Sequence, residues 1–200
     1  LRRPPRSTPF PYTTLFRSCR AGSLELAKLS NRYGVSGLQK HFSALLDYAE
    51  RMTREEIATW TDGTYTFEDH IDDDGFSDIP LPIRVAITVT GDRVLVDYTG
   101  SAPPVAAALN STKSYTNSCT YLSVRCALKG DIPNNAGVFR AISVSAPEAS
   151  ILNPVLPAAC AARALTGYRV VDAMFGALDR QSRRLNSSRA LISYAVFCLK

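Results

Sequence analysis

The stretch Ile83–Tyr98 is the feature of the sequence that most constrains the fold. Apolar residues alternate with more polar ones from Ile83 to Thr90, which is the pattern of a strand with one buried face. Gly91-Asp92 then forms a two-residue hairpin signal, and Arg93–Tyr98 can return as the antiparallel partner. Because such a sheet must bury its apolar face against another layer, the chain has to supply helices that pack on it.

Helical periodicity flanks the hairpin on both sides. Residues 23–33 follow a helical pattern up to Gly34, and Ser36 can cap a second helix that ends near Trp60. The second helix carries an apolar stripe at i, i+3, i+4 spacing, which we expect the sheet to cover: Leu38, Phe42, Leu45, Leu46, Ala49 and Met52. Two more helices are expected, over Tyr115–Leu128 and Ala161–Leu178.

Two further strands complete the expected elements. Tyr65–Ile71 alternates loosely, and Phe139–Val144 follows a turn rich in proline, asparagine and glycine. The sequence therefore predicts an α+β fold, with an N-terminal helical pair, an antiparallel sheet that contains the hairpin, and further helices packed on that sheet. Its 200 residues suit roughly one domain.

The formal charge of +5 comes from the ends of the chain. Ten of the 23 basic residues lie in 1–20 and 180–200, whereas all 18 acidic residues lie between Glu25 and Asp179, so residues 21–179 carry −5. A nucleic-acid interface needs basic side chains gathered on a folded surface, so we expect no nucleic-acid partner. The longest apolar run is about half the ~20 residues of a membrane helix, so we expect no membrane partner either.

Residues 1–22 are expected to be a non-native or disordered arm. The first 18 residues contain four prolines and show neither a helical nor a strand period. Phe10–Ser18 also matches the conceptual translation of a sequencing adaptor.

No part of the sequence forms a recognisable metal site. The densest acidic cluster surrounds His70, but aligning Gly75 with the glycine of a calcium loop places Leu81 where a bidentate glutamate is required. The five cysteines are irregularly spaced and form no CxxC pair, which is typical of unpaired thiols in the reducing cytosol. We therefore expect no metal ligand in this chain and a cytoplasmic location.

The polar candidates that remain lie on loops, and the nucleotide motifs GxxxxGK[ST] and GxGxxG are absent. They are the segment Asp97–Gly100, Asn110, and the turn at 134–137. Such side chains either bind polar ligands or stabilise turns, and composition leaves both functions open. Three arginines could clamp a carboxylate or phosphate, or could pair with acidic side chains: Arg140, Arg163 and Arg169.

Several of these segments, in this order, resemble the hydantoinase B / 5-oxoprolinase family, which includes N-methylhydantoinase B subunits. The resemblance runs through DGTYTFEDHIDDDG (62–75), IRVAITVTGDRVLVDYTGSAP (83–103), residues 121–159 and RALTGYRVVDAMFGAL (163–178). The resemblance covers residues 23–178. Residues 179–200 do not resemble the family, so we expect them to be an unrelated or frameshifted tail. Because the family's B chains are much longer, the chain resembles an internal fragment that holds an incomplete domain.

The resemblance implies a subunit that hydrolytically opens a cyclic amide, such as hydantoin or 5-oxoproline. A hydantoinase A-type partner subunit or domain would use the ATP, because phosphorylating the amide oxygen makes the carbonyl attackable by water. A divalent metal would belong to the missing upstream part, so this segment is expected to bind no cofactor and to be inactive alone. Two alternatives stay open, an acetone-type ketone carboxylase subunit and a non-catalytic docking module.

The family's motifs also imply site residues in this chain. Its D-[FY]-[TS]-G and N-x-G patterns, with Asn110 following the first at the expected distance, imply three catalytic candidates nearest the parent's active site or subunit interface: Asp97, Asn110 and Asn135. These patterns and the family's D-D-x-G pattern place five further residues at a substrate site or subunit interface: Asp72, Thr99, Gly100, Gly137 and Arg140. If these residues act together, they must converge on one concave pocket.

Overall fold

The structure is a computed structural model that describes residues 11–185, with side-chain exposure for 16–182. The chain divides into two compact units, Leu1–Leu45 and Leu46–Lys200. The first is called the helical unit below and the second the sheet unit.

The helical unit contains α1 (Pro11–Tyr33) and the beginning of α2 (Val35–Ile57). Gly34 separates the two helices with a φ of +71°, which confirms the predicted stop. However, α1 begins at Pro11 and not at Ser23, so residues 11–22, predicted as a disordered or non-native arm, are helical. Proline is tolerated in the first turn of a helix because its missing N–H would have no partner there. The first ten residues of the predicted arm lie outside the described residues.

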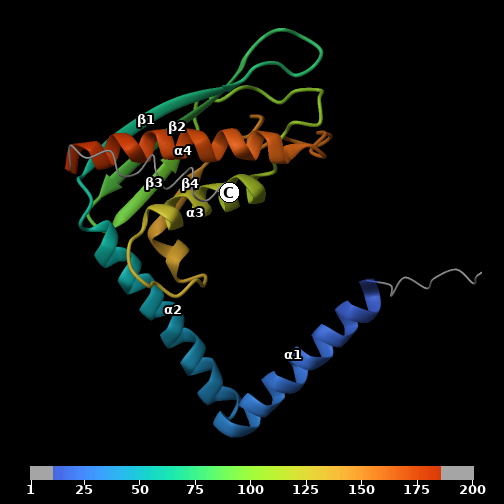
Figure 1. The fold of residues 1–200 in the computed structure, drawn as a ribbon, viewed down its shortest axis with the longest axis vertical. Coiled ribbons are helices and arrows are strands. Elements are labelled where there is room, and N and C mark those ends of the chain that lie inside the picture. Colours follow the sequence, from blue (N-terminus) through green and yellow to red (C-terminus); the bar gives the residue numbers. More distant parts are fainter. Residues whose placement is uncertain (1–10, 186–200) are drawn as a thin grey trace, which may run out of the picture. The chain divides into compact units, whose positions relative to one another are not determined.

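The sheet unit is built on a four-stranded sheet in the order β1-β2-β3-β4 (Figure 1). Its strands are β1 (Gly63–Ile71), β2 (Leu81–Thr90), β3 (Arg93–Asp97) and β4 (Ile142–Ser145). The predicted hairpin is confirmed, because β2 and β3 are antiparallel neighbours joined at Thr90 and Arg93. The last strand differs from the expectation: β4 pairs parallel to β3, so the sheet is mixed.

The long connection before β4 explains both the parallel pairing and a shifted boundary. It contains α3 (Lys113–Ala127), and a crossover of this length lets a strand return in the same direction as its neighbour. Phe139, predicted as strand, lies instead in a short 3-10 helix, η1 (Val138–Ala141), that precedes β4.

Two helices cover one face of the sheet. α4 (Arg163–Leu185) packs across β1 and β2, and α3 packs beside α4 and against β4 (Figure 1). Their approach is close, since a Cβ on Gly176 of α4 would lie 2.6 Å from the Phe67 ring of β1. The core lies between these layers, and the α+β class is confirmed. α4 continues past Leu178 to Leu185, into the segment predicted as an unrelated tail, and residues 186–200 lie outside the described part.

The apolar stripe of α2 is only partly covered. Ala49 and Ile57 are fully buried, whereas Phe42 and Leu45 are 48% and 50% exposed. Part of the stripe thus stays exposed, because periodicity shows which face of a helix is apolar but not how much of its length has a partner. Among the described residues, no helix is long and apolar enough to cross a bilayer.

Candidate functional site

The segment Asp97–Gly100 forms a turn at the end of β3. The Asp97 carboxylate accepts hydrogen bonds from the Thr99 backbone N–H at 3.2 Å and the Thr99 hydroxyl at 2.9 Å. Gly100 has a φ of +88°, and a Cβ there would lie 3.2 Å from Arg84 Cδ. Ser101 then binds both backbone groups of Arg84. These residues therefore close β3 and direct the chain back along β2, which is a turn-stabilising role.

Asn110 is fully buried and joins two loops. Its side-chain oxygen accepts a bond from the Val105 N–H at 2.9 Å, and its amide nitrogen donates to the carbonyls of Val105, Ala107 and Ala159 at 2.8, 3.2 and 2.9 Å. Every polar atom of this side chain is thus bound to the main chain. Asn110 holds the segment 105–110 in shape and leaves no group directed at a ligand.

A buried hydroxyl network lies next to Asn110 and was not anticipated from the sequence. Thr120 donates to the Thr116 carbonyl at 2.9 Å, so the Tyr98 hydroxyl, 2.6 Å away, donates to Thr120. Thr116 donates to the Leu152 carbonyl at 2.8 Å. Burial raises the pKa of Tyr98, which keeps this phenol protonated and makes it a structural donor. The available signal was the i, i+4 spacing of Thr116 and Thr120 on the face of α3 that also carries Val124.

Asn135 and Gly137 shape the turn before η1. The Asn135 side-chain oxygen accepts the Gly137 N–H at 2.8 Å. A Cβ on Gly137 would lie 2.0 Å from the Leu46 carbonyl oxygen of α2, so only glycine permits this contact of two backbones. The glycine of the N-x-G pattern is therefore needed for the close packing of the turn before η1 against α2.

Arg140 belongs to an ion-pair group at the same place. Its guanidinium lies 2.8 Å from Asp47 and 3.2 Å from Glu50. Arg54 pairs with Glu50 at 2.8 Å and with Asp92 of the hairpin at 3.2 Å. Hydrogen bonds from Arg54, and then from Arg140, hold the pKa of Glu50 below its ordinary value. Arg140 is thus paired within the sheet unit and ties η1 to α2.

Asp72 lies on the exposed loop between β1 and β2. Beside it, Asp73 accepts the Gly75 N–H at 2.7 Å, and Asp74 accepts the N–H groups of Phe76 and Ser77 at 2.9 and 2.8 Å. These are turn-stabilising contacts. The described residues contain no group of three His, Cys, Asp or Glu side chains placed to hold a metal ion.

The predicted residues do not gather at one point. Val94 of β3 pairs with Ile142 of β4, which sets Arg140 level with the hairpin, whereas Asp97 pairs with Ser145 at the other end of both strands. β3 has five residues, so its two ends lie about 13 Å apart. Asp72 follows the last β1–β2 pair, which lies beyond the end of β3. Asp97, Arg140 and Asp72 thus lie at three separate places, and a catalytic role for any of the eight residues stays a prediction.

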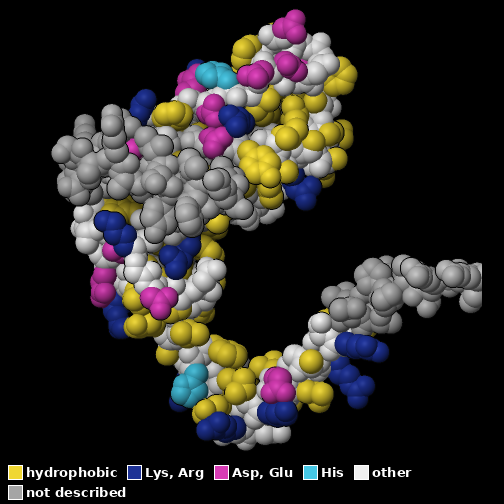
Figure 2. All heavy atoms as spheres, in the orientation of Figure 1, with side chains coloured by type: hydrophobic (Ala, Val, Ile, Leu, Met, Phe, Trp, Pro, Cys, Tyr) yellow, Lys and Arg dark blue, Asp and Glu magenta, His cyan; other side chains and the backbone are white. Residues whose placement is uncertain are grey.

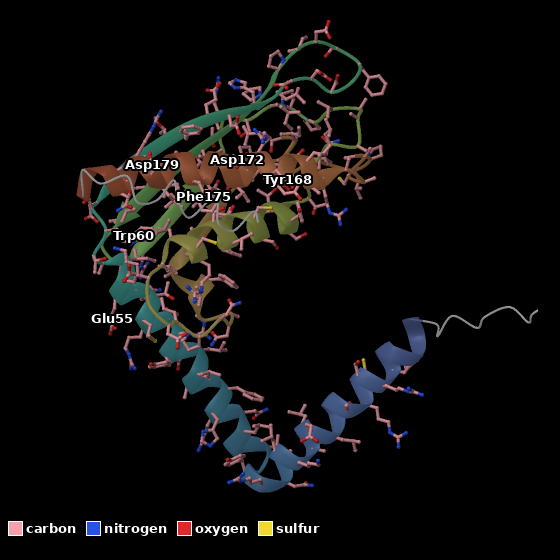
Figure 3. The ribbon with its side chains drawn as sticks, in the orientation of Figure 1. Glu55, Trp60, Tyr168, Asp172, Phe175 and Asp179 are labelled. Atoms are coloured by element: carbon pink, nitrogen blue, oxygen red, sulfur yellow. The ribbon has the colours of Figure 1, made fainter. Side chains whose placement is uncertain are left out.

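The other two candidate arginines are also engaged. Arg169 of α4 lies 3.3 Å from Asp69 and 2.8 Å from Asp172. Asp172 lies on α4 between Tyr168 and Phe175 (Figure 3). The Arg163 guanidinium stacks over the Tyr115 ring at 5.4 Å.

The chain matches the family model "Hydantoinase B/oxoprolinase" over residues 3–197. This range is wider at both ends than the 23–178 covered by the motif resemblance. It is 32% identical over 175 residues to the B-type component of a D-/L-hydantoinase of Pseudomonas sp. (strain NS671), a match that covers 80% of this chain and 29% of that protein. It is 27% identical to the 5-oxoprolinase of Saccharomyces cerevisiae over 152 residues, which is 74% of this chain and 12% of that protein.

The fold has a counterpart among solved structures. The ATP-dependent caprolactamase of Pseudomonas jessenii superposes with a TM-score of 0.76 at 26% identity, over 84% of this chain and 29% of that one. The chain thus spans less than a third of the length of each of these relatives. Because the family model matches nearly all of its length, this chain belongs to the hydantoinase B/oxoprolinase family.

Proposed function

We propose that this chain is a segment of the B-type subunit of an ATP-coupled hydrolase that opens a cyclic amide. The observation that carries the proposal is the family match over residues 3–197, together with the fold shared with an ATP-dependent caprolactamase. The D-/L-hydantoinase, 5-oxoprolinase and caprolactamase relatives are all named for cyclic amides. A hydantoinase A-type partner that uses the ATP, and a cytoplasmic location, are parts of the same proposal.

Within such a subunit, the described residues act as a scaffold. A lactam is a weak electrophile, so its hydrolysis needs an activated carbonyl, a general base and donors for the developing oxyanion. The Asn110 side chain directs all of its polar atoms to the main chain, and Arg140 is held by two carboxylates. We propose that this segment positions loops and contacts the rest of the enzyme, while the reacting groups come from elsewhere in the subunit.

A chimera tests this proposal. Residues 23–178 replace the matching segment of the caprolactamase beta subunit, and ring opening and ADP release are followed with caprolactam, hydantoin and 5-oxoproline in the presence of the other caprolactamase subunit. We expect ring opening coupled to ADP formation with at least one of the three substrates. A chimera that folds and assembles, as judged by circular dichroism and gel filtration, but opens no ring would overturn the proposal.

The same chimera also tests the scaffold role, by comparing the effect of a substitution on stability with its effect on kcat. Asp97→Ala and Asn135→Ala should lower the unfolding temperature and leave kcat within about threefold at a temperature where the chimera is folded. A loss of kcat of a hundredfold or more, at unchanged stability, would make the residue catalytic instead.

A further inference from the structure

The helical unit presents an apolar surface along both of its helices. Its exposed large side chains are 42–68% accessible: Phe16, Leu24, Leu26, Leu29, Tyr33, Val35, Phe42 and Leu45. No side chain from residue 16 to residue 45 is buried, and hydrophobic side chains lie open on the visible face of these helices (Figure 2). Most of the stability of a helix in a protein comes from tertiary packing of its apolar face. Exposed apolar side chains that continue along two helices therefore indicate an interaction surface.

The charge of the helical unit restricts what that partner can be. Among its residues 11–45 there are five basic side chains, Arg17, Arg20, Lys28, Arg32 and Lys40, against one acidic side chain, Glu25. Two helical units packed on each other would bring these like charges together, which costs affinity. The complementary surface should combine apolar and acidic side chains.

The sheet unit carries such a surface on the loop between β1 and β2. Phe76 and Ile79 are 78% and 66% exposed. They lie among four acidic residues and no basic one: Asp72, Asp73, Asp74 and Asp78. In Figure 2, acidic side chains gather over this loop next to hydrophobic ones. The loop thus matches the helical unit in both respects.

We propose that the helical unit of one copy of this chain docks on the β1–β2 loop of a second copy. Each copy carries both surfaces, so two such contacts, one in each direction, make a twofold dimer. The apolar side chains of the helices cover Phe76 and Ile79, and the basic ones face the acidic residues of the loop. This dimer does not depend on the proposed enzymatic function.

Charge exchange on the 200-residue protein tests the docking. One variant carries Arg17→Glu and Lys40→Glu, both in exposed positions of a helix. A second carries Asp72→Lys and Asp78→Lys on the exposed loop. The third combines all four changes. Molar mass is measured by light scattering after gel filtration and by sedimentation over a concentration series, and circular dichroism confirms that each variant folds.

We expect the wild type to dimerise and each of the first two variants to dissociate with a dissociation constant raised roughly tenfold. The combined variant should regain the dimer, because the acidic side chains introduced on its helices attract the basic side chains introduced on its loop. The wild-type dimer should also weaken when the salt concentration rises from about 50 to about 500 mM.

Three outcomes would overturn the proposal. The first is a wild type that stays monomeric at about 100 µM. The second is a combined variant that stays monomeric, since the charges introduced on the two surfaces then do not pair. The third is a monomer whose helical unit binds vesicles of phosphatidylserine and phosphatidylcholine, which assigns the basic apolar surface to an anionic bilayer.

Discussion

The two units of this chain use the same kind of side chain in opposite ways. In the sheet unit, the alternating apolar side chains of β2 are all buried, and those of Ile83, Ile87 and Val89 are at most 1% exposed. In the helical unit, leucines and aromatic residues at helical spacing stay half exposed. An apolar pattern therefore predicts the element and its inward face, while burial depends on a second surface that the pattern does not describe.

Ile87 gives the strongest test of this difference in burial. This fully buried residue lies between Tyr65 of β1 and Val96 of β3, so Ile87→Ala should lower the free energy of unfolding by about 2–5 kcal/mol. Leu95→Ala is the matched control, because Leu95 lies on the other face of the same sheet and is 45% exposed. Urea denaturation of both variants measures the difference. Equal losses would mean that the outer face of the sheet is covered as well.

Asn110 tests whether the buried polar groups belong to the same core. Asn110→Ala removes four main-chain contacts and leaves the Val105 N–H and carbonyl without their partner, so we expect a loss of about 2–3 kcal/mol. Asn134→Ala, in an exposed position, should cost less than about 0.5 kcal/mol. Urea denaturation again measures both variants, and a loss below about 1 kcal/mol for Asn110→Ala would contradict the assigned role.

The same elements show which features of the fold and the candidate site can be predicted from the sequence. Alternation and Gly91-Asp92 predicted the hairpin because both signals are local in the chain. The parallel pairing of β4 was missed because four residues carry no direction of their own. The motif residues were found, but Asn110 and Asn135 turned out to bind the main chain around them. A motif shows that a residue type is needed at a position, whereas only its contacts show whether a turn or a ligand needs it.

The ion-pair group around Glu50 should make a smaller contribution that depends on pH. Arg54 and Arg140 lower the pKa of Glu50 in the folded chain below its ordinary value of 4.5. The unfolded chain therefore binds the proton first, so the contribution is present above about pH 4.5 and is lost as the pH falls toward the lower folded pKa. Glu50→Gln should flatten the slope of the free energy of unfolding against pH in this window. The slope above about pH 6 should stay unchanged. Denaturation curves from about pH 3 to about pH 7 measure this, and an unchanged slope would show that Glu50 is not coupled to folding.

The smallest effect is expected in the helical unit, on the same helix that enters the core. Phe42→Ser should change the free energy of unfolding of the sheet unit by less than about 0.5 kcal/mol, because Phe42 is half exposed. Ile57→Ser, at the end of the same helix, should cost several times more, because Ile57 is fully buried. The measurement is made at concentrations low enough to keep the chain monomeric, so that docking on a second copy cannot contribute. A large loss for Phe42→Ser under these conditions would show that its ring is covered within one chain. An effect that emerges only as the concentration rises would place the partner of this surface on another copy.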